Sequence, residues 1–167
     1  NQTKLPIIVD ADTGFGGPAN VYRTVKDLEN AGASALVLED QIFPKKCALT
    51  DQVLLLNLKE AKERLHTAIQ ASKENKNILV IARTDALTLG SMNETLKRCL
   101  EYKKMGADAV FMTGLNTQKQ LKIIRDHVKG IPLMLNITQN VKFHLKDVIK
   151  NKFKLALFSQ QILDGYI

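Results

Sequence analysis

The sequence has no tryptophan, only two cysteines and four prolines, and an aromatic content of 5%. The two cysteines, Cys47 and Cys99, cannot build a disulfide framework, and their spacing fits no zinc-binding pattern. No apolar run approaches the roughly 20 residues that a membrane-spanning helix needs. Low-complexity stretches are also lacking, so we expect a single domain over residues 1–167. So little cysteine favours a reducing compartment, and we expect a cytoplasmic location, or the mitochondrial matrix if the source is eukaryotic.

An excess of positive charge is the feature that would suggest a nucleic-acid partner. The chain carries 24 Lys and Arg residues against 17 Asp and Glu residues, a formal net charge of +7. However, the basic residues are spread along amphipathic segments without the interleaved aromatic residues of nucleic-acid surfaces. We therefore expect no nucleic-acid or membrane partner, and we assign the basic residues to solvated helix faces or to attraction of an anionic substrate.

Short apolar runs alternate with longer amphipathic segments along the whole chain. Each run is apolar on both faces, which is typical of the strands of a buried parallel sheet. The expected strands occupy residues 6–9, 35–38, 78–81, 109–112, 131–135 and 155–158. The segments between them repeat apolar residues at helical spacing. This alternation predicts six βα units, arranged either as a doubly wound open sheet or as a barrel.

Acidic residues stand at the carboxyl ends of the first two expected strands, the edge at which parallel α/β folds build their sites. Asp10 and Asp12 are two residues apart on one strand, so we expect their side chains on the same side. Glu39 ends the next strand. Carboxylates so close repel one another unless a cation lies between them, and three hard oxygen ligands with room for water suit Mg²⁺ or Mn²⁺. Helix capping or pairing with lysines is the alternative role.

Basic and thiol side chains follow at the same edge. Lys45, Lys46 and Cys47 lie in the loop after the second strand, and a thiol beside two ammonium groups should have a depressed pKa. Cys47 is therefore a candidate general acid or nucleophile, with an inert surface cysteine as the alternative. Arg83, at the end of the third strand, is a candidate anion clamp that needs an acidic partner such as Asp85 or a substrate.

The remaining cysteine and the three histidines carry no comparable signal. Cys99 lies beside Leu100 in an amphipathic segment, and we expect it to pack in the core. His66, His127 and His144 fall within helical patterns at no metal-ligand spacing. We therefore expect none of the three histidines to be catalytic.

Four motifs, in their order and spacing, resemble those of the isocitrate lyase / phosphoenolpyruvate mutase superfamily over residues 6–160. The motifs are Asp10-Ala11-Asp12-Thr13-Gly14-Phe15-Gly16, Leu38-Glu39-Asp40-Gln41, Pro44-Lys45-Lys46-Cys47 and Ala82-Arg83-Thr84-Asp85-Ala86. The resemblance implies a (β/α)₈ TIM-type barrel, commonly a homotetramer, that binds Mg²⁺ and a small 2-hydroxy or 2-keto acid. The chain would supply six βα units with the first two missing, so we expect a fragment of a longer chain.

The resemblance also implies roles for individual residues. Asp12 would hold Mg²⁺ directly, while Asp10 and Glu39 would act directly or through water. Arg83 would bind a substrate carboxylate or phosphonate, and residues 41–55 would form a gate over the substrate. With Arg83, the implied catalytic residues are Cys47 and Lys45, and the implied substrate-binding residues are Lys46, Asn136, Thr138, Thr13 and Gly14.

Two branches of the superfamily compete for this sequence. In the branch of the isocitrate and 2-methylisocitrate lyases, the gate reads Lys-Lys/Arg-Cys-Gly-His, and its cysteine protonates the departing carbanion. This chain keeps the Lys-Lys-Cys part, while Ala48 and Leu49 replace Gly-His and Thr113 stands where lyases typically carry glutamate. Phe43 and Pro44, followed by a lysine, match the gate of the phosphoenolpyruvate mutase and phosphonopyruvate hydrolase branch instead.

From these motifs we expect a Mg²⁺-dependent carbon–carbon lyase. It would cleave a 2-hydroxy tricarboxylate resembling 2-methylisocitrate by retro-aldol chemistry, giving pyruvate or glyoxylate and a succinate-like acid. The alternatives are a phosphoenolpyruvate mutase or phosphonopyruvate hydrolase, and a degenerate relative without catalytic activity.

Overall fold

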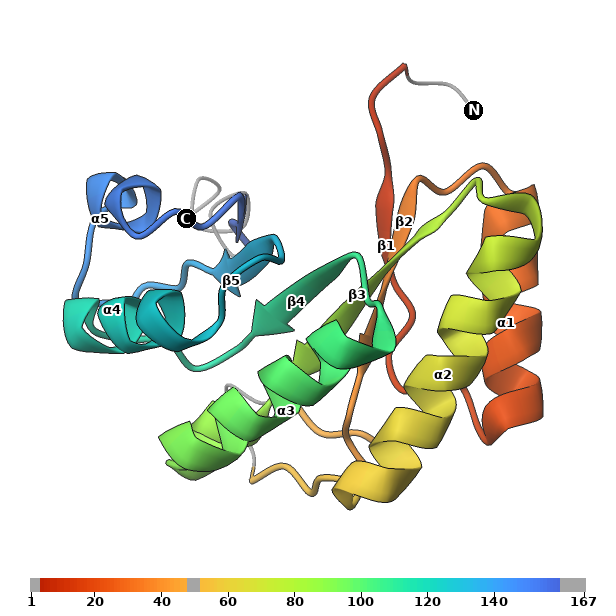
Figure 1. The fold of residues 1–167 in the computed structure, drawn as a ribbon, viewed down its shortest axis with the longest axis horizontal. Helices are drawn as coiled ribbons and strands as arrows, with labels where there is room; N and C mark the ends of the chain where they lie inside the picture. The colour runs from red at the N-terminus through yellow and green to blue at the C-terminus, as the bar shows by residue number, and fades with distance from the viewer. Residues whose placement is uncertain (1–3, 48–51, 160–167) are drawn as a thin grey trace, which may run out of the picture.

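A computed structural model describes residues 4–47 and 52–159 of the chain. Its six strands are β1 (Ile8–Asp10), β2 (Ala35–Glu39), β3 (Leu79–Thr84), β4 (Ala109–Met112), β5 (Leu133–Asn136) and β6 (Leu155–Leu157). All six are parallel, and strands that follow one another in sequence are neighbours in the sheet. A doubly wound sheet would reverse its strand order part-way, so the sequential order decides for the barrel architecture. Figure 1 shows the sheet curling into a half-barrel.

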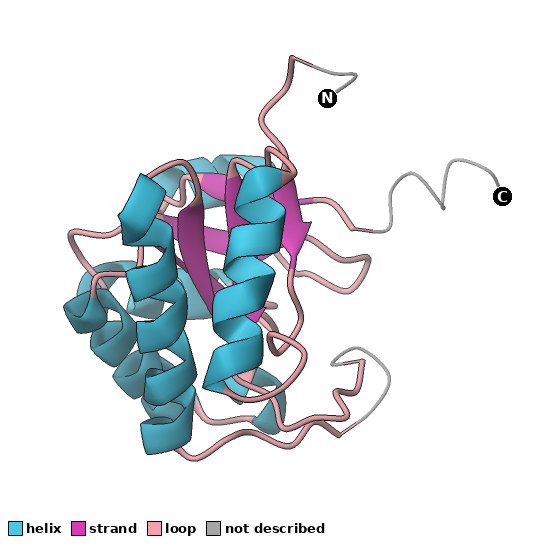
Figure 2. Cartoon of the chain, turned by 90° about the vertical axis from the view of Figure 1, so that its right-hand side faces the viewer, coloured by secondary structure: helices cyan, strands magenta, loops and turns pink. Residues whose placement is uncertain are grey.

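Helices connect the strands and lie on the outer side of the curl (Figures 1 and 2). They are α1 (Pro18–Asn30), α2 (Leu58–Asn75), the 3₁₀ helix η1 (Ala86–Leu89), α3 (Met92–Met105), α4 (Gln118–His127) and α5 (Leu145–Lys150). Three of them begin at a polar cap, because the side chains of Asn57, Ser91 and Thr117 each accept a backbone N–H three residues on. The short helix η1 was not predicted.

Two apolar clusters cover the two faces of the sheet. The outer cluster joins strand residues such as Leu36 and Val110 to helix residues such as Leu65 and Ile124, and all four are buried. The inner cluster contains residues of the strands themselves, including Val37 and Phe111. Helices therefore cover the outer face alone, as in the wall of a barrel. The expected six βα units and barrel-type fold are confirmed.

Within the described residues, the sheet has two open edges, since β1 pairs with β2 and β6 pairs with β5, and neither has a second neighbour. Ile8 on β1 and Leu157 on β6 are exposed accordingly. Among the same residues, no helix is both long enough and apolar enough to cross a membrane.

Candidate active site

A cavity of about 690 Å³ opens on the inner face of the half-barrel. Its floor is apolar and includes Val37, Phe111 and Met134, while Asp10 and Arg83 lie at its polar edge. These two residues come from the carboxyl-end halves of β1 and β3, and this edge is the face where parallel barrels place their chemistry. Thr113, Asn136 and Thr138, which follow or end later strands, line the same cavity, whereas Asp12 and Glu39 are not among its lining residues.

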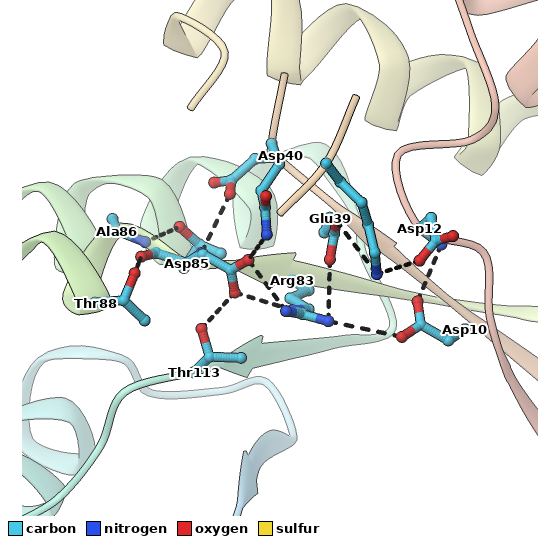
Figure 3. A network of polar contacts seen from close by, with 12 residues as sticks. Asp10, Asp12, Glu39, Asp40, Arg83, Asp85, Ala86, Thr88 and Thr113 are labelled. Carbon is cyan, nitrogen blue, oxygen red and sulfur yellow. Dashed lines mark hydrogen bonds and ion pairs between the residues drawn. The ribbon is translucent and has the colours of Figure 1, made fainter. Parts of the chain in front are cut away.

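Arg83 is the centre of an ion-pair cluster at this edge (Figure 3). Its Nε and Nη2 atoms donate to the two carboxylate oxygens of Asp85 at 2.9 and 3.1 Å. Its Nη1 atom lies 3.0 Å from Glu39 Oε2 and 3.6 Å from Asp10 Oδ2, and its guanidinium lies 5.5 Å above the ring of Phe111. Arg83 therefore has the acidic partners that the sequence required, and it holds three carboxylates from three successive strand ends.

The two aspartates of the first motif both reach the site, but not by strand alternation. Strand β1 ends at Asp10, and Asp12 adopts a left-handed backbone conformation with φ of +50°. The expectation that both side chains project from one regular strand is thus wrong, because the chain turns between them. The backbone N–H of Asp12 donates to Asp10 Oδ1 at 3.0 Å, which holds the two residues together in the turn.

Lys45 reaches back from the loop after β2 into the acidic group. Its ammonium forms a close ion pair with Asp12 and lies 3.8 Å from Glu39 Oε1. Burial opposes protonation of Lys45, but the contact with Asp12 and the charges of Glu39 and Asp10 outweigh burial, so the pKa of Lys45 is raised. Lys45 is therefore a fixed cation in the acidic group.

Glu39 is the buried acid of the group. Neither of its carboxylate oxygens has a hydrogen-bond partner among the described residues, although Arg83 and Lys45 are close. Burial raises the pKa of Glu39 to about 7, against the opposing pull of the Arg83 charge. A buried carboxylate without hydrogen bonds costs free energy in the folded protein, so Glu39 is a candidate for a functional role rather than a structural one.

These acids fit a magnesium ion that keeps part of its water shell. Within residues 4–47 and 52–159, no group of three or more His, Cys, Asp or Glu side chains could hold a metal ion by itself. Mg²⁺ in proteins commonly takes one or two carboxylates and several waters, so such a group is not required. Four acids, Asp10, Asp12, Glu39 and Asp85, are in contact with two cations. Two formal negative charges remain, which a divalent cation would balance.

Asp85 is fully buried and fixes the position of Arg83. Besides the two bonds from Arg83, it accepts a hydrogen bond of 2.5 Å from Gln41 Nε2 and a short one from the hydroxyl of Thr113. In the sequence, Thr113 was noted as a departure from the lyase pattern, and Gln41 as part of a motif and as the first residue of the expected gate, but neither was given a role beside Asp85. The signal available for Gln41 was its place beside the motif acid Asp40, and for Thr113 its place at the end of an apolar run.

A second buried cluster supports the site from the helix side of the sheet. Asp40 accepts hydrogen bonds from Arg98 Nη1 at 3.0 Å, from the hydroxyl of Tyr102 at 2.7 Å and from the backbone N–H of Asp85 at 3.2 Å. Arg98 also donates to the carbonyl of Leu56 at 2.8 Å. This cluster was missed in the sequence, because Arg98 and Tyr102 sit in an amphipathic helix where a basic residue normally faces solvent.

The predicted substrate-binding residues fall into two groups. Lys46, Asn136 and Thr138 line the cavity, as does Cys47. Thr13 and Gly14 are not among the residues that line it. Thr13 is buried, and its carbonyl accepts a hydrogen bond from Arg64, whereas Gly14 forms a turn with φ of +81° and packs against α1. Part of the predicted gate, including Ala48 and Leu49, lies outside the described residues.

The other predicted residues behave simply. Cys99 is fully buried, as expected for a core position, and burial raises the pKa of its thiol to about 12. His66, His127 and His144 are exposed, and none of them lines the cavity.

Several characterised proteins resemble this chain. It is 37% identical to 2,3-dimethylmalate lyase of Eubacterium barkeri over 129 residues, 77% of this chain and 44% of that protein. It is 37% identical to 2-methylisocitrate lyase of Aeropyrum pernix over 136 residues (81% and 43%), and 39% identical to an oxaloacetate decarboxylase of Rhodopseudomonas palustris over 120 residues (72% and 41%). The chain thus spans less than half the length of these relatives.

Crystal structures of the same superfamily share the fold. A 2,3-dimethylmalate lyase matches with a TM-score of 0.90 and 29% identity, over 96% of this chain and 55% of that one. A phosphoenolpyruvate phosphomutase from Streptomyces platensis matches with a TM-score of 0.89 and 26% identity, over 98% and 58%. The family model for phosphoenolpyruvate phosphomutase matches residues 1–154. Because that match spans most of the sequence and includes all four motifs, the chain belongs to the phosphoenolpyruvate phosphomutase family, within the phosphoenolpyruvate mutase/isocitrate lyase superfamily.

Proposed function

We propose that this chain carries the catalytic face of a Mg²⁺-dependent carbon–carbon lyase. Its substrate would be a 2-hydroxy tricarboxylate resembling 2-methylisocitrate, cleaved by a retro-aldol reaction to pyruvate or glyoxylate and a succinate-like acid. The observation that carries the proposal is the lining of one cavity by Asp10, the basic residues Lys45, Lys46 and Arg83, and the residue Cys47. Asp12 and Glu39 lie just behind this lining, in contact with Lys45 and Arg83. Relatives named as 2-methylisocitrate and 2,3-dimethylmalate lyases support it.

In this proposal the acidic residues hold the metal ion, and the basic residues attract the negatively charged substrate. Asp12 would hold the Mg²⁺ ion directly, with Asp10 and Glu39 acting directly or through water, and the bound ion would stabilise negative charge on the oxygen of an enolate-like product. Arg83 is bound to Asp85 through Nε and Nη2, which directs its Nη1 toward the acidic group. Arg83 therefore orients the carboxylates of the site, and its positive charge attracts a substrate carboxylate toward the cavity.

Carbon–carbon cleavage requires two proton transfers, one away from the substrate hydroxyl and one to the departing acid. The substrate hydroxyl loses its proton, its O–H electrons form the carbonyl of the keto product, and the electrons of the broken carbon–carbon bond move to the departing acid. That carbanion must then receive a proton. Cys47 is exposed at the cavity, and we assign it the role of donating this proton, with Lys46 beside it to bind a carboxylate of the departing acid.

A substrate panel with one variant pair tests the assignment. Purified protein with Mg²⁺ would be incubated with 2-methylisocitrate, isocitrate, 2,3-dimethylmalate and oxaloacetate, and the keto product would be measured by a coupled dehydrogenase. We expect Cys47→Ser to abolish cleavage while pyruvate and Mg²⁺ still bind in calorimetry. Cys99→Ala, at the buried thiol, is the matched control and should retain turnover. Near-complete turnover by Cys47→Ser would reject the role of Cys47.

Thr113 favours a second candidate, the mutase and phosphonopyruvate hydrolase branch. Its hydroxyl donates to Asp85 at the position where the lyases of the superfamily typically carry glutamate. In this reading Arg83 and Lys45 would attract a phosphonate instead of a carboxylate. Release of pyruvate from phosphonopyruvate, without cleavage of any hydroxy acid in the panel, would select this candidate. Failure to bind Mg²⁺ and to turn over any of these compounds would point to a non-catalytic relative.

We also propose that the protein assembles as a homotetramer, as the superfamily resemblance implies. Sedimentation equilibrium of the purified protein tests this directly, because a monomer and a tetramer differ fourfold in mass.

A further inference from the structure

Gln41 connects two parts of the site that are separate in sequence. It follows strand β2 by two residues, and it is 1% exposed. Its side-chain amide donates from Nε2 to Asp85 Oδ2 at 2.5 Å, and its Oε1 accepts the backbone N–H of Lys46 at 3.0 Å. A neutral amide can make both hydrogen bonds at once, because its carbon carries a donor nitrogen and an acceptor oxygen.

On one side of this connection is Asp85, the residue that fixes Arg83. Arg83 and Asp85 share two hydrogen bonds, and the hydroxyl of Thr113 donates to the same carboxylate (Figure 3). Thr113 and Gln41 therefore both donate a hydrogen bond to Asp85. Within the described residues, Gln41 also accepts a hydrogen bond from Lys46, and Thr113 does not. This difference makes Thr113 a matched control for Gln41.

On the other side is the segment of residues 42–47, which ends in Lys45, Lys46 and Cys47. All six of its residues are exposed, so the segment has little apolar burial to hold it in place. Its polar attachments to the body of the protein include the ion pairs of Lys45 with Asp12 and Glu39 and the hydrogen bond from the Lys46 backbone to Gln41. The Lys46 bond is the attachment next to Cys47.

We propose that Gln41 is a positioning residue: it holds the backbone of Lys46, and thereby Cys47, at the cavity in a fixed relation to the Asp85–Arg83 pair. The role of Cys47 in turnover rests on the proposed function, but the positioning itself does not. Gln41 makes no direct contact with substrate in this account. It acts by restricting an exposed segment that would otherwise sample other positions.

Amide hydrogen exchange at Lys46 tests the positioning without any substrate. Gln41→Met keeps the length and burial of the side chain but removes both hydrogen bonds. We expect exchange of the Lys46 amide to accelerate about fivefold or more in Gln41→Met, the factor for losing one hydrogen bond. Thr113→Val, which removes a bond to Asp85 alone, should leave exchange at Lys46 unchanged. Equal exchange in wild type and Gln41→Met, or equal acceleration in both variants, overturns the inference.

A double-mutant cycle on turnover tests whether the positioned group is Cys47. Because Cys47→Ser is expected to abolish steady-state cleavage, the cycle compares the residual product formed by concentrated protein over long incubation. If Gln41 acts through Cys47, the Gln41→Met/Cys47→Ser protein should form this residual product no more slowly than Cys47→Ser alone. If the double variant lost turnover by the product of the two single-variant factors, Gln41 and Cys47 would act independently, and the action of Gln41 through Cys47 would be refuted. If wild type cleaves none of the proposed substrates, the proposed function fails, while hydrogen exchange at Lys46 still decides whether Gln41 positions the segment.

Discussion

Replacing Arg98 by methionine should destabilise this protein more than any surface change, and the reason lies in the buried cluster behind the site. Arg98 and Asp40 have side chains that are 5% and 3% exposed, and their Nη1 and Oδ2 atoms are 3.0 Å apart. Methionine fills much of the same apolar volume but removes the charge and all the donors. Asp40 would keep the hydroxyl of Tyr102 and one backbone N–H, and the Leu56 carbonyl would lose its donor.

The expected loss of stability follows from a general property of buried ion pairs: removing one partner costs more than removing both. Removing one partner leaves an uncompensated buried charge, which costs about 3–5 kcal/mol. The Asp40→Asn/Arg98→Met double variant removes that charge as well, so it should be more stable than Arg98→Met alone. Arg23→Met is the matched control, because the Arg23–Asp27 pair is 83% and 67% exposed, and it should cost less than about 0.5 kcal/mol.

Urea unfolding followed by circular dichroism measures these differences. The pH dependence gives a second check, since burial raises the pKa of Asp40 above its ordinary value of 3.8 even beside Tyr102 and Arg98. A raised folded-state pKa means that the folded protein keeps a proton which the unfolded chain releases, so stability falls as pH rises above that ordinary value. The loss in Arg98→Met should thus be smaller in acid than at pH 7. A loss below about 1 kcal/mol at pH 7, or additive effects in the double variant, would refute the reasoning.

Two further changes have signs that the structure determines. Burial raises the pKa of Glu39 from 4.5 to about 7, so the metal-free protein should lose stability as the pH rises between those values, by at most ~1.4 kcal/mol per pKa unit. Glu39→Gln should remove this decline in unfolding experiments with a chelator present, and an unchanged decline would count against the assignment. Gly14→Ala places a Cβ 2.5 Å from Val21 Cγ2 at φ of +81°, which should lower stability by about 1–3 kcal/mol; a thermal midpoint equal to that of wild type would contradict this.

The sequence predicts the six strands well, because their apolar runs are separated by long helical segments. The alternation alone does not decide between an open sheet and a barrel, since it builds both; the prediction of a barrel came from the resemblance of the four motifs to a known superfamily. The choice depends on which strands are neighbours, and pairings such as Ile8 with Ala35 are properties of the folded chain. The 3₁₀ helix Ala86–Leu89 was also missed, because four residues are too few to show a period.

The residues of the candidate site likewise include some that the sequence identified and some that it missed. Arg83, Glu39 and Asp10 were identifiable because each stands at or near the end of an apolar run, where the fold brings strand ends together. The sequence did not show that Lys45 returns from its loop into the acidic group, because an ion pair between residues 33 positions apart leaves no local pattern. Gln41 was equally inconspicuous, since its role depends on two distant partners.

Glu39 and Asp40 show why burial alone does not identify a functional acid. They are adjacent in sequence and both almost fully buried, yet the side chain of Glu39 contacts Arg83 on the inner side of the sheet, while that of Asp40 contacts Arg98 and Tyr102 of α3. Asp40 faces the helices and accepts hydrogen bonds from Arg98, the hydroxyl of Tyr102 and the backbone of Asp85, so its burial supports the fold. Glu39 lies beside Arg83 and Lys45, which line the cavity, and neither of its oxygens is hydrogen-bonded in the described part of the chain. Such a carboxylate does not help the chain to fold, whereas a ligand that binds carboxylate oxygens would give it a function. Glu39→Gln should therefore stabilise the metal-free protein and weaken Mg²⁺ binding, whereas the Asp40 cluster should affect stability first.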